Sequence, residues 1–331
     1  PEPALMQQMA DFHEALARAG VLLDAAGLKP SREGWRIEHG PQGARLLERA
    51  GLRVRIVREG FGVVMDRALA PDDVLLLTAG ASDGIGAVYA RRFAARGANL
   101  VLVARRAERL EALAQELRAE QGVSVEVIAA DLGGADDLAR VEARLRDDEA
   151  ITGLVNNAGI AGEQSFVETD PAYLTGLIGL NILAVTRLSR AIAPRLAARG
   201  AGTLINITSV TALMPDGFTA VYPASKAYVL AFTEALQVEL GGKGVRVQAV
   251  LPGITRTPIW TAEQIATIPP HMVMDVEVMV DAALAGLDQG EHITIPALPD
   301  RADLDAYLAA RAALRPNLSL SQAAPRYAVT A

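Results

Sequence analysis

Several residue types are scarce or missing in this chain of 331 residues, and each absence removes a class of chemistry. The chain has no cysteine, which excludes disulfide bonds, thiolate catalysis and cysteine-ligated zinc. Its only histidines are scattered without the spacing of metal ligands, so no metal site is expected; they are His13, His39, His271 and His292. The formal net charge of -7 provides no basic surface for nucleic acid.

Long apolar runs and targeting signals are also absent. No apolar stretch reaches the length of a membrane span, and no secretory signal is visible, although the chain begins at Pro1. We therefore expect a cytoplasmic protein that binds neither membrane nor nucleic acid. With 51% hydrophobic and 21% charged residues, the chain can form a substantial core of one large domain or two.

Residues 1–70 are predicted to form a small α+β appendage. Apolar spacing predicts a helix over 5–19 and a short helix over 44–50, whereas segments 35–38 and 52–57 alternate like half-buried strands. Residues 9–31 resemble the first helix and loop of YCII-related small domains, without that family's opening strand or its Asp-Gly-Pro-Phe signature. An alternative gives this unit a ligand or interface function of its own.

Residues 71–331 are predicted to form one domain, in which strands and helices alternate from residue 74 to residue 295 and a C-terminal tail follows. Short apolar segments predict strands at 74–78, 99–104, 123–130, 151–156, 202–208, 245–251 and 293–295. Helical patterns cover 84–97, 107–119, 135–146, 171–198, 224–240 and 281–287. Such alternation is typical of α/β proteins, so we expect a Rossmann-type doubly wound parallel sheet with helices on both faces. Its ligand should lie beyond the carboxyl ends of the strands.

A glycine-rich turn follows the first of these strands. Gly80, Gly84 and Gly86 lie between a strand and a helix, where they let the backbone turn tightly and approach a pyrophosphate. The free N–H groups and positive dipole end of the helix would face that anion. Glycines in such a turn can also be merely structural, but their context here favours a dinucleotide site.

The end of the second strand bears on the choice of nucleotide. An acidic residue there would take the ribose 2′-hydroxyl, but this chain has Ala104 followed by Arg105. A guanidinium suits a 2′-phosphate, which favours NADP(H) over NAD(H). The alternative is a pair of solvated arginines at the start of a helix. Asp131 and Leu132, after the third strand, are expected to border the adenine.

Three polar side chains are predicted to converge at the end of the strand over 202–208. Ser209 follows that strand, and Tyr222 and Lys226 are four residues apart on one helix face. A free tyrosine has a pKa of about 10, and a neighbouring cation would lower it toward the range useful for acid–base catalysis. Ser209 could hold a carbonyl oxygen beside Tyr222. The alternative is an ordinary amphipathic helix.

Together these motifs resemble those of the short-chain dehydrogenase/reductase family over residues 74 to about 331. They occur in the family's order, as Gly80-x-x-x-Gly84-x-Gly86, Asp131-Leu132, Asn156-Asn157-Ala158-Gly159, Asn181, Ser209, Tyr222-x-x-x-Lys226 and Pro252-Gly253. One departure is that Ala79, rather than threonine, precedes the first glycine, from which we expect some local loosening of the turn.

The resemblance implies a role for each matched residue. The glycine-rich turn (Gly80, Ser82, Gly84, Ile85 and Gly86), the segment 156–159 and the segment Pro252 to Thr257 would contact the nucleotide, with Arg105, Asp131 and Leu132 around its adenosine. Asn181 would hold a water for proton relay; the alternative is a partner that caps a helix kink. Ser209 would orient the carbonyl, Tyr222 would transfer the proton, and Lys226 would bind the nicotinamide ribose.

The resemblance also implies a substrate and an assembly. The apolar segment 259–273 would close over the substrate, which suggests an apolar or bulky ketone or secondary alcohol; a plain hydrophobic cover is the alternative. The helices near 173–199 and 222–240 are the family's usual pairing surfaces, so a homodimer or homotetramer is expected. A catalytically silent dinucleotide-binding regulatory or scaffold protein is the alternative function.

Overall fold

The computed structural model describes the strand backbones 46–49, 52–56, 63–66 and 74–77, residue 81, and residues 83–162, 165–216 and 218–327. Strands β1 (Leu46–Arg49), β2 (Leu52–Ile56) and β3 (Val63–Asp66) form an antiparallel sheet. The helix predicted over 44–50 is therefore wrong: strand pairing outweighs the preference of so short a segment. The helix predicted over 5–19, the strand over 35–38 and the YCII-like segment lie outside the described residues.

The main sheet has seven strands, and all of its pairs are parallel. Its order is β10-β9-β8-β7-β4-β5-β6. The bounds are β4 Val74–Leu77, β5 Asn99–Ala104, β6 Val125–Ala129, β7 Ile151–Asn156, β8 Gly202–Ile207, β9 Val245–Val250 and β10 Ile293–Thr294. The strand order reverses between β4 and β7, where a doubly wound sheet binds its ligand. The predicted Rossmann-type α/β fold is confirmed.

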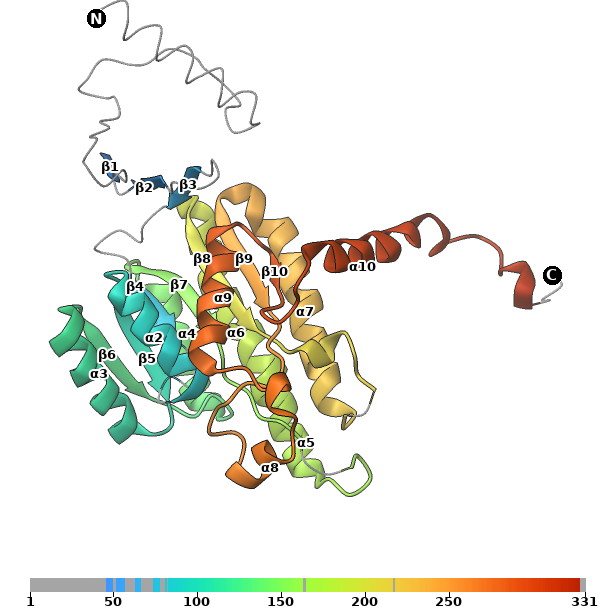
Figure 1. The fold of residues 1–331 in the computed structure, drawn as a ribbon, viewed down its shortest axis with the longest axis horizontal. Coiled ribbons are helices and arrows are strands. Elements are labelled where there is room, and N and C mark those ends of the chain that lie inside the picture. The colour runs from blue at the N-terminus through green and yellow to red at the C-terminus, as the bar shows by residue number, and fades with distance from the viewer. Residues whose placement is uncertain are drawn as a thin grey trace, which may run out of the picture.

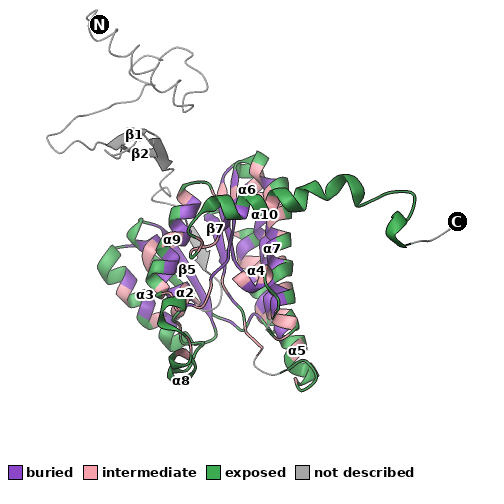
Figure 2. Cartoon of the chain, turned by 45° about the vertical axis from the view of Figure 1, so that its right-hand side comes forward, coloured by how far each residue is buried: buried purple, intermediate pink, exposed green. Residues whose placement is uncertain are grey.

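Helices cover both faces of this sheet (Figure 1). One face carries α2 (Gly84–Ala95), α3 (Ala107–Gln121) and α9 (Val276–Asp288), and the other carries α4 (Ala135–Asp147), α6 (Val185–Arg199) and α7 (Val221–Leu240). In α6, Leu188, Ile192 and Leu196 recur every four residues and are all buried against the sheet. Figure 2 shows the result: a buried central sheet inside helices whose outer sides are exposed.

The long helix predicted over 171–198 is divided in the structure. It begins as α5 (Pro171–Ile178), whose Asp170 accepts a hydrogen bond from the Ala172 amide, continues as a π-helical segment over Gly179–Ala184, and ends as α6. Insertions of this kind often occur at functional sites. By length and composition alone this helix could cross a membrane, but its α6 part contributes to the core described above.

Two further helices complete the described chain. The short α8 (Ala262–Ala266) starts with a capping box, in which the side chain of Thr261 and that of Gln264 each bond the other's backbone amide. Helix α10 (Arg301–Ala313) buries Leu304 and then extends away from the sheet, mostly exposed (Figure 2). The sequence patterns did not predict either helix.

Candidate active site

The structure brings Ser209, Tyr222 and Lys226 together, as the sequence predicts. Ser209 follows β8, and the other two residues lie in the first two turns of α7. A hydrogen bond joins Tyr222 to Ser209, and Lys226 Nζ lies 5.7 Å from the centre of the Tyr222 ring. The ammonium also donates to the Ile207 carbonyl over 3.1 Å. A phenol, a hydroxyl and an ammonium therefore lie close together at the carboxyl end of β8, which is an interior strand of the sheet.

The position of α7 against β8 is fixed by buried polar contacts. Thr208 Oγ1 donates to the Lys226 carbonyl over 2.7 Å, and Asn206 Nδ2 donates to Thr233 Oγ1 over 2.9 Å. These four residues are at most 5% exposed. Because buried polar groups are costly to leave without partners, these bonds specify one register of helix on strand. That register determines where Tyr222 and Lys226 point.

Burial governs the ionisation of both reactive groups. It lowers the pKa of the Lys226 ammonium from 10.5 to about 8. Burial raises the pKa of the Tyr222 phenol above its ordinary value, and the hydrogen bond with Ser209 only partly opposes it. The expected lowering of the Tyr222 pKa by Lys226 is therefore corrected for this structure: the loss of hydration outweighs the nearby cation.

Asn181 lies in the π-helical segment and is 1% exposed. Its Oδ1 accepts from the Ile160 amide over 2.9 Å, while its Nδ2 donates to the Ile160 carbonyl and to Ser225 Oγ. The side chain thus ties the helix to the loop after β7 and to α7. Since both Nδ2 hydrogens have protein partners, a water held at Asn181, as the family resemblance implies, would have to donate to one of its oxygens, such as the backbone carbonyl.

Ser225 is a site residue that sequence reasoning missed. Its hydroxyl accepts from Asn181 and donates to the Tyr222 carbonyl over 2.7 Å, and the residue is 1% exposed. It therefore links Asn181 to the backbone of the turn that carries Tyr222. The only sequence signal was its place directly before Lys226, where a small polar residue on a buried helix face needs a partner.

The start of α2 meets the loop after β9, although these segments are far apart in the sequence. Gly84 has a φ of +56°, which favours glycine, and a Cβ at this position would contact the Thr257 side chain at 3.4 Å. Ile85 is partly buried and Gly86 is buried in the same turn of α2. Pro252 is buried, and Gly253 accepts a hydrogen bond from Thr255. Gly80, Ser82 and the Thr78-Ala79 departure lie outside the described residues.

The segment after β7 places a glycine directly beside the reactive groups. A Cβ on the exposed Gly159 would lie 3.3 Å from both Asn181 Oδ1 and Lys226 Nζ. Asn157 is partly buried, and Ala158 is buried. A hydrogen-bonding cradle without a side chain in it, next to a buried cation, suits the ribose of a nicotinamide nucleotide. The residues present therefore fit the cofactor that the sequence implies.

The residues expected around the adenosine divide into two groups. Arg105, directly after β5, and Asp131, after β6, are exposed. Asp131 Oδ1 accepts from the Gly133 amide over 3.0 Å, which shapes the turn. Leu132, in contrast, is 2% exposed and packs in the core, so its side chain is not available to a ligand.

The sequence patterns did not predict an ion-paired cluster that lies near Arg105, at the start of α2 and of α3. Asp83 Oδ2 lies 2.5 Å from Arg106 Nη2 and 3.0 Å from Arg109 Nη1. The carboxylate precedes α2 and the guanidiniums belong to the start of α3, so the cluster joins the segments that follow two neighbouring strands. The sequence shows these charges, but not that they meet.

Large apolar side chains are exposed in the loop before α7 and in the segment after β9. Met214 and Phe218 precede α7, and Ile259, Trp260 and Met272 belong to the segment after β9. Their exposed fractions lie between 37% and 69%. Exposed apolar side chains of this size are typical of a surface that binds an apolar ligand.

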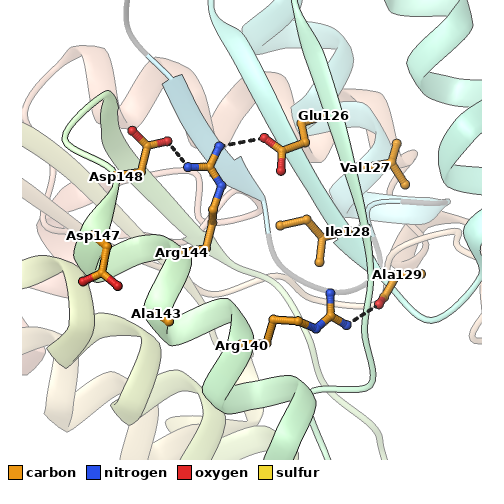
Figure 3. Close-up of a pocket in the computed structure, with 9 residues that line it drawn as sticks. All are labelled: Glu126, Val127, Ile128, Ala129, Arg140, Ala143, Arg144, Asp147 and Asp148. Carbon is orange, nitrogen blue, oxygen red and sulfur yellow. Dashed lines mark hydrogen bonds and ion pairs between the residues drawn. The ribbon is translucent and has the colours of Figure 1, made fainter.

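The hollow drawn in Figure 3 lies elsewhere, between α4 and the edge strand β6. Arg144 crosses it and pairs with Glu126 and Asp148, while Arg140 donates to the Ala129 carbonyl over 2.7 Å. Both arginines thus already bond carboxylates or a backbone carbonyl at the edge strand, so their presence in this hollow does not require a ligand. None of the residues predicted for catalysis lines this hollow.

Comparison with known proteins identifies the family. The model of the short chain dehydrogenase family matches residues 74–266, which is more than half of the chain. The chain therefore belongs to the short-chain dehydrogenase family, whose members are oxidoreductases acting on CH–OH and C=O groups. The match starts at β4, and the YCII resemblance of the preceding residues is not borne out.

Individual relatives agree with this assignment. A short-chain dehydrogenase from Sphingobium yanoikuyae, solved in complex with NADPH, is 48% identical; the match covers 77% of this chain and 100% of that one, with a TM-score of 0.74. A bulky-bulky ketone specific alcohol dehydrogenase from Comamonas testosteroni is 45% identical, covering 76% and 98%, with a TM-score of 0.71. A very-long-chain 3-oxoacyl-CoA reductase from Anas platyrhynchos is 36% identical over 52% of this chain, which spans only 57% of that protein.

Proposed function

We propose that this chain is an NADP(H)-dependent oxidoreductase that interconverts a ketone and a secondary alcohol, with Tyr222 as general acid and base. The convergence of Tyr222 with Ser209 and Lys226 carries the proposal. Each of the three groups is buried or partly buried, and each has a hydrogen-bond partner: Tyr222 bonds Ser209, Ser209 Oγ accepts from the Thr211 amide, and Lys226 donates to the Ile207 carbonyl. Such preorganisation is what proton transfer to a reacting oxygen requires.

Each residue then has a separate task. The Ser209 hydroxyl donates to the carbonyl oxygen of the substrate and keeps it beside Tyr222. The Tyr222 hydroxyl gives its proton to that oxygen in the direction of reduction and receives it in the direction of oxidation. Lys226 donates to the nicotinamide ribose, and its charge favours the phenolate. A bound nicotinamide nucleotide supplies or accepts the hydride.

Asn181 acts as a positioning residue in this scheme. It holds Ile160 at the nicotinamide end and, through Ser225, the backbone of Tyr222. Its backbone carbonyl is the group that would bind a water leading from Lys226 to solvent. The nucleotide itself would be held by 84–86, by 157–159 and by the segment 252–257.

NADP(H) is the proposed nucleotide because no acidic residue follows β5. Arg105 is exposed at that place and has no ion pair with any residue that the structure describes. A guanidinium there attracts a 2′-phosphate. The relative from Sphingobium yanoikuyae was solved with NADPH, which supports the same preference.

The proposed substrate is a bulky, apolar ketone or the matching secondary alcohol. The exposed apolar side chains of Met214 and Phe218 belong to the loop that leads into α7 and Tyr222, and those of Ile259, Trp260 and Met272 belong to the segment after β9. A relative with 45% identity is described as specific for bulky-bulky ketones. These two observations support a substrate whose carbonyl carries large apolar groups on both sides.

A turnover screen tests the proposed function. Ketones of increasing size, aldehydes and secondary alcohols would be offered with NADPH or NADP and with NADH or NAD, and the change in nicotinamide absorbance would be followed. Turnover of bulky ketones with NADPH is expected. Nucleotide binding without turnover of any substrate would favour the silent regulatory alternative, for which one relative, an inactive hydroxysteroid dehydrogenase-like protein, is a precedent.

The proposed assembly is a cytoplasmic homodimer or homotetramer. Ile178 and Leu183 are exposed on the helix that begins at Pro171, and Val238 is 85% exposed on α7. Apolar residues on these two helices suit pairing with a second copy. We also propose residues 1–70 as an appendage to the enzyme domain at 71–331. Light scattering of the full chain and of a chain lacking 1–70, with turnover measured on both, tests these points.

A further inference from the structure

Asp83 is a charged residue at the nucleotide end to which the proposed function gives no role. Its Oδ2 atom accepts from Arg106 Nη2 at 2.5 Å and from Arg109 Nη1 at 3.0 Å. Both arginines belong to the start of α3, which follows β5, whereas Asp83 directly precedes α2. One carboxylate therefore pairs with two guanidiniums, and both guanidiniums belong to the neighbouring unit formed by β5 and α3.

The direction of the Asp83 side chain is informative. An aspartate at a helix start commonly accepts from the backbone amides of the first turn, but Asp83 makes no such bond with α2. It bonds to the arginines instead. These cations lie at the positive end of the α3 dipole, where positive charge is unfavourable, and Asp83 compensates them.

The pairing with Asp83 reduces the positive charge that the 2′-phosphate of a bound NADP(H) would meet. Arg105, Arg106 and Arg109 follow β5 within five residues, and Asp83 neutralises part of the charge of the last two. Its own negative charge also repels a phosphate dianion nearby. A guanidinium already paired with a carboxylate has fewer donors left for phosphate oxygens.

We propose that Asp83 sets how strongly this chain prefers NADP(H) to NAD(H), by occupying Arg106 and Arg109. This rests on the proposed function, in which the adenosine ribose lies at the end of β5. Removing the charge of Asp83 ends the ion pairs of Arg106 and Arg109 with this carboxylate and raises the positive charge that the 2′-phosphate meets. NADH has no phosphate there, so its binding changes little.

The chain offers a matched control on the same two helices. Arg91 of α2 and Glu116 of α3 form a separate ion pair, which is bidentate, with N–O distances of 2.7 and 3.1 Å. Glu116 lies well beyond the start of α3, whereas Arg106 and Arg109 lie at its start. Glu116→Gln removes a carboxylate that joins α2 to α3 without changing the charge at the nucleotide end.

The test compares dissociation constants of NADPH and NADH for the full-length wild type, Asp83→Asn and Glu116→Gln, measured by nucleotide fluorescence. Asp83→Asn is expected to raise the ratio of the NADH to the NADPH constant about tenfold, with most of the change in NADPH. The increase should shrink at high salt, because these groups are partly exposed. Glu116→Gln should leave the ratio unchanged.

Two more variants keep the inference falsifiable. Asp83→Ser removes the charge but retains a residue that can cap α2, and should act in the same direction. Adding Arg109→Gln to Asp83→Asn should remove part of the gain. An unchanged ratio, or weaker NADPH binding in both Asp83 variants, would overturn the inference. A wild type that binds neither nucleotide would instead overturn the proposed function, before any variant is made.

Discussion

The catalytic end and the nucleotide end of this molecule are built in different ways. At the catalytic end, Asn181, Ser225 and Lys226 are at most 5% exposed and are held by hydrogen bonds. At the nucleotide end, Arg105 and Arg106 are exposed, and the ion pairs of Asp83 are partly solvated. Burial fixes geometry, because an unpartnered polar group costs free energy there. Exposed charges adjust affinity and leave geometry largely unchanged.

This difference predicts large, salt-independent effects at the catalytic end. It predicts small, salt-dependent effects at the nucleotide end, where water and ions screen the charges. Variants at the two ends can be compared through the same measurements of turnover, nucleotide affinity and stability.

The largest effect is expected from Tyr222→Phe. This change removes the proton donor and keeps the ring, so kcat should fall at least about a thousandfold. The affinity for NADPH should stay within about twofold, because the ring still fills its place. Steady-state turnover and nucleotide fluorescence measure the two quantities. The control is Tyr228→Phe on the same helix, whose hydroxyl lies 2.8 Å from that of Thr186. Wild-type turnover in Tyr222→Phe would remove Tyr222 as the acid.

Asn181→Leu should have the next largest effect. It removes three hydrogen bonds, so that the partly buried Ile160 backbone loses its Asn181 partners and the buried Ser225 hydroxyl keeps only its bond to the Tyr222 carbonyl. We expect a loss of about 3 kcal/mol or more in the free energy of unfolding and a lower kcat. Urea denaturation and turnover assays check this, with Asn317→Leu on the surface as control. Unchanged stability would show that the π-helical segment holds its position without this side chain.

The burial of Lys226 should make the free energy of unfolding depend on pH when no nucleotide is bound. Because burial lowers its pKa from 10.5 to about 8, the unfolded chain binds more protons than the folded one between these pH values. The free energy of unfolding should therefore rise from pH 8 toward pH 10.5, by at most about 3 kcal/mol. Lys226→Met should remove this rise.

Urea denaturation across that pH range measures the difference between wild type and Lys226→Met. The tyrosines Tyr89 and Tyr222, whose pKa burial raises, lower stability above pH 10 in both proteins and so largely cancel. A difference between the two proteins that does not change with pH would contradict the prediction.

The smallest effect is expected from Arg105→Ala, at the nucleotide end. NADPH binding should weaken about tenfold at low salt, and less at high salt, while NADH binding barely changes. Fluorescence titration at two salt concentrations measures this. Equal losses for both nucleotides would remove Arg105 from the recognition of the 2′-phosphate.

Sequence patterns predicted the strands of the main sheet closely. The predicted segments 99–104 and 151–156 coincide with β5 and β7, because short apolar runs bounded by turns leave little choice of structure. The pattern failed at 44–50, where a strand pair decided the conformation, and within 171–198, where a π-helical segment interrupts the helix. In both places the deciding contacts come from other segments.

The amino-acid sequence by itself thus determined the alternation of strands and helices. It also determined the spacing that places Tyr222 and Lys226 on one face of a helix. These are local properties, since period and turn chemistry are written into neighbouring residues. Tertiary structure decided that burial raises the pKa of Tyr222, that Asn181 reaches Ile160 and Ser225, and that Asp83 meets Arg106. Burial and contacts between distant segments arise only once the sheet has formed, because they depend on which elements pack together.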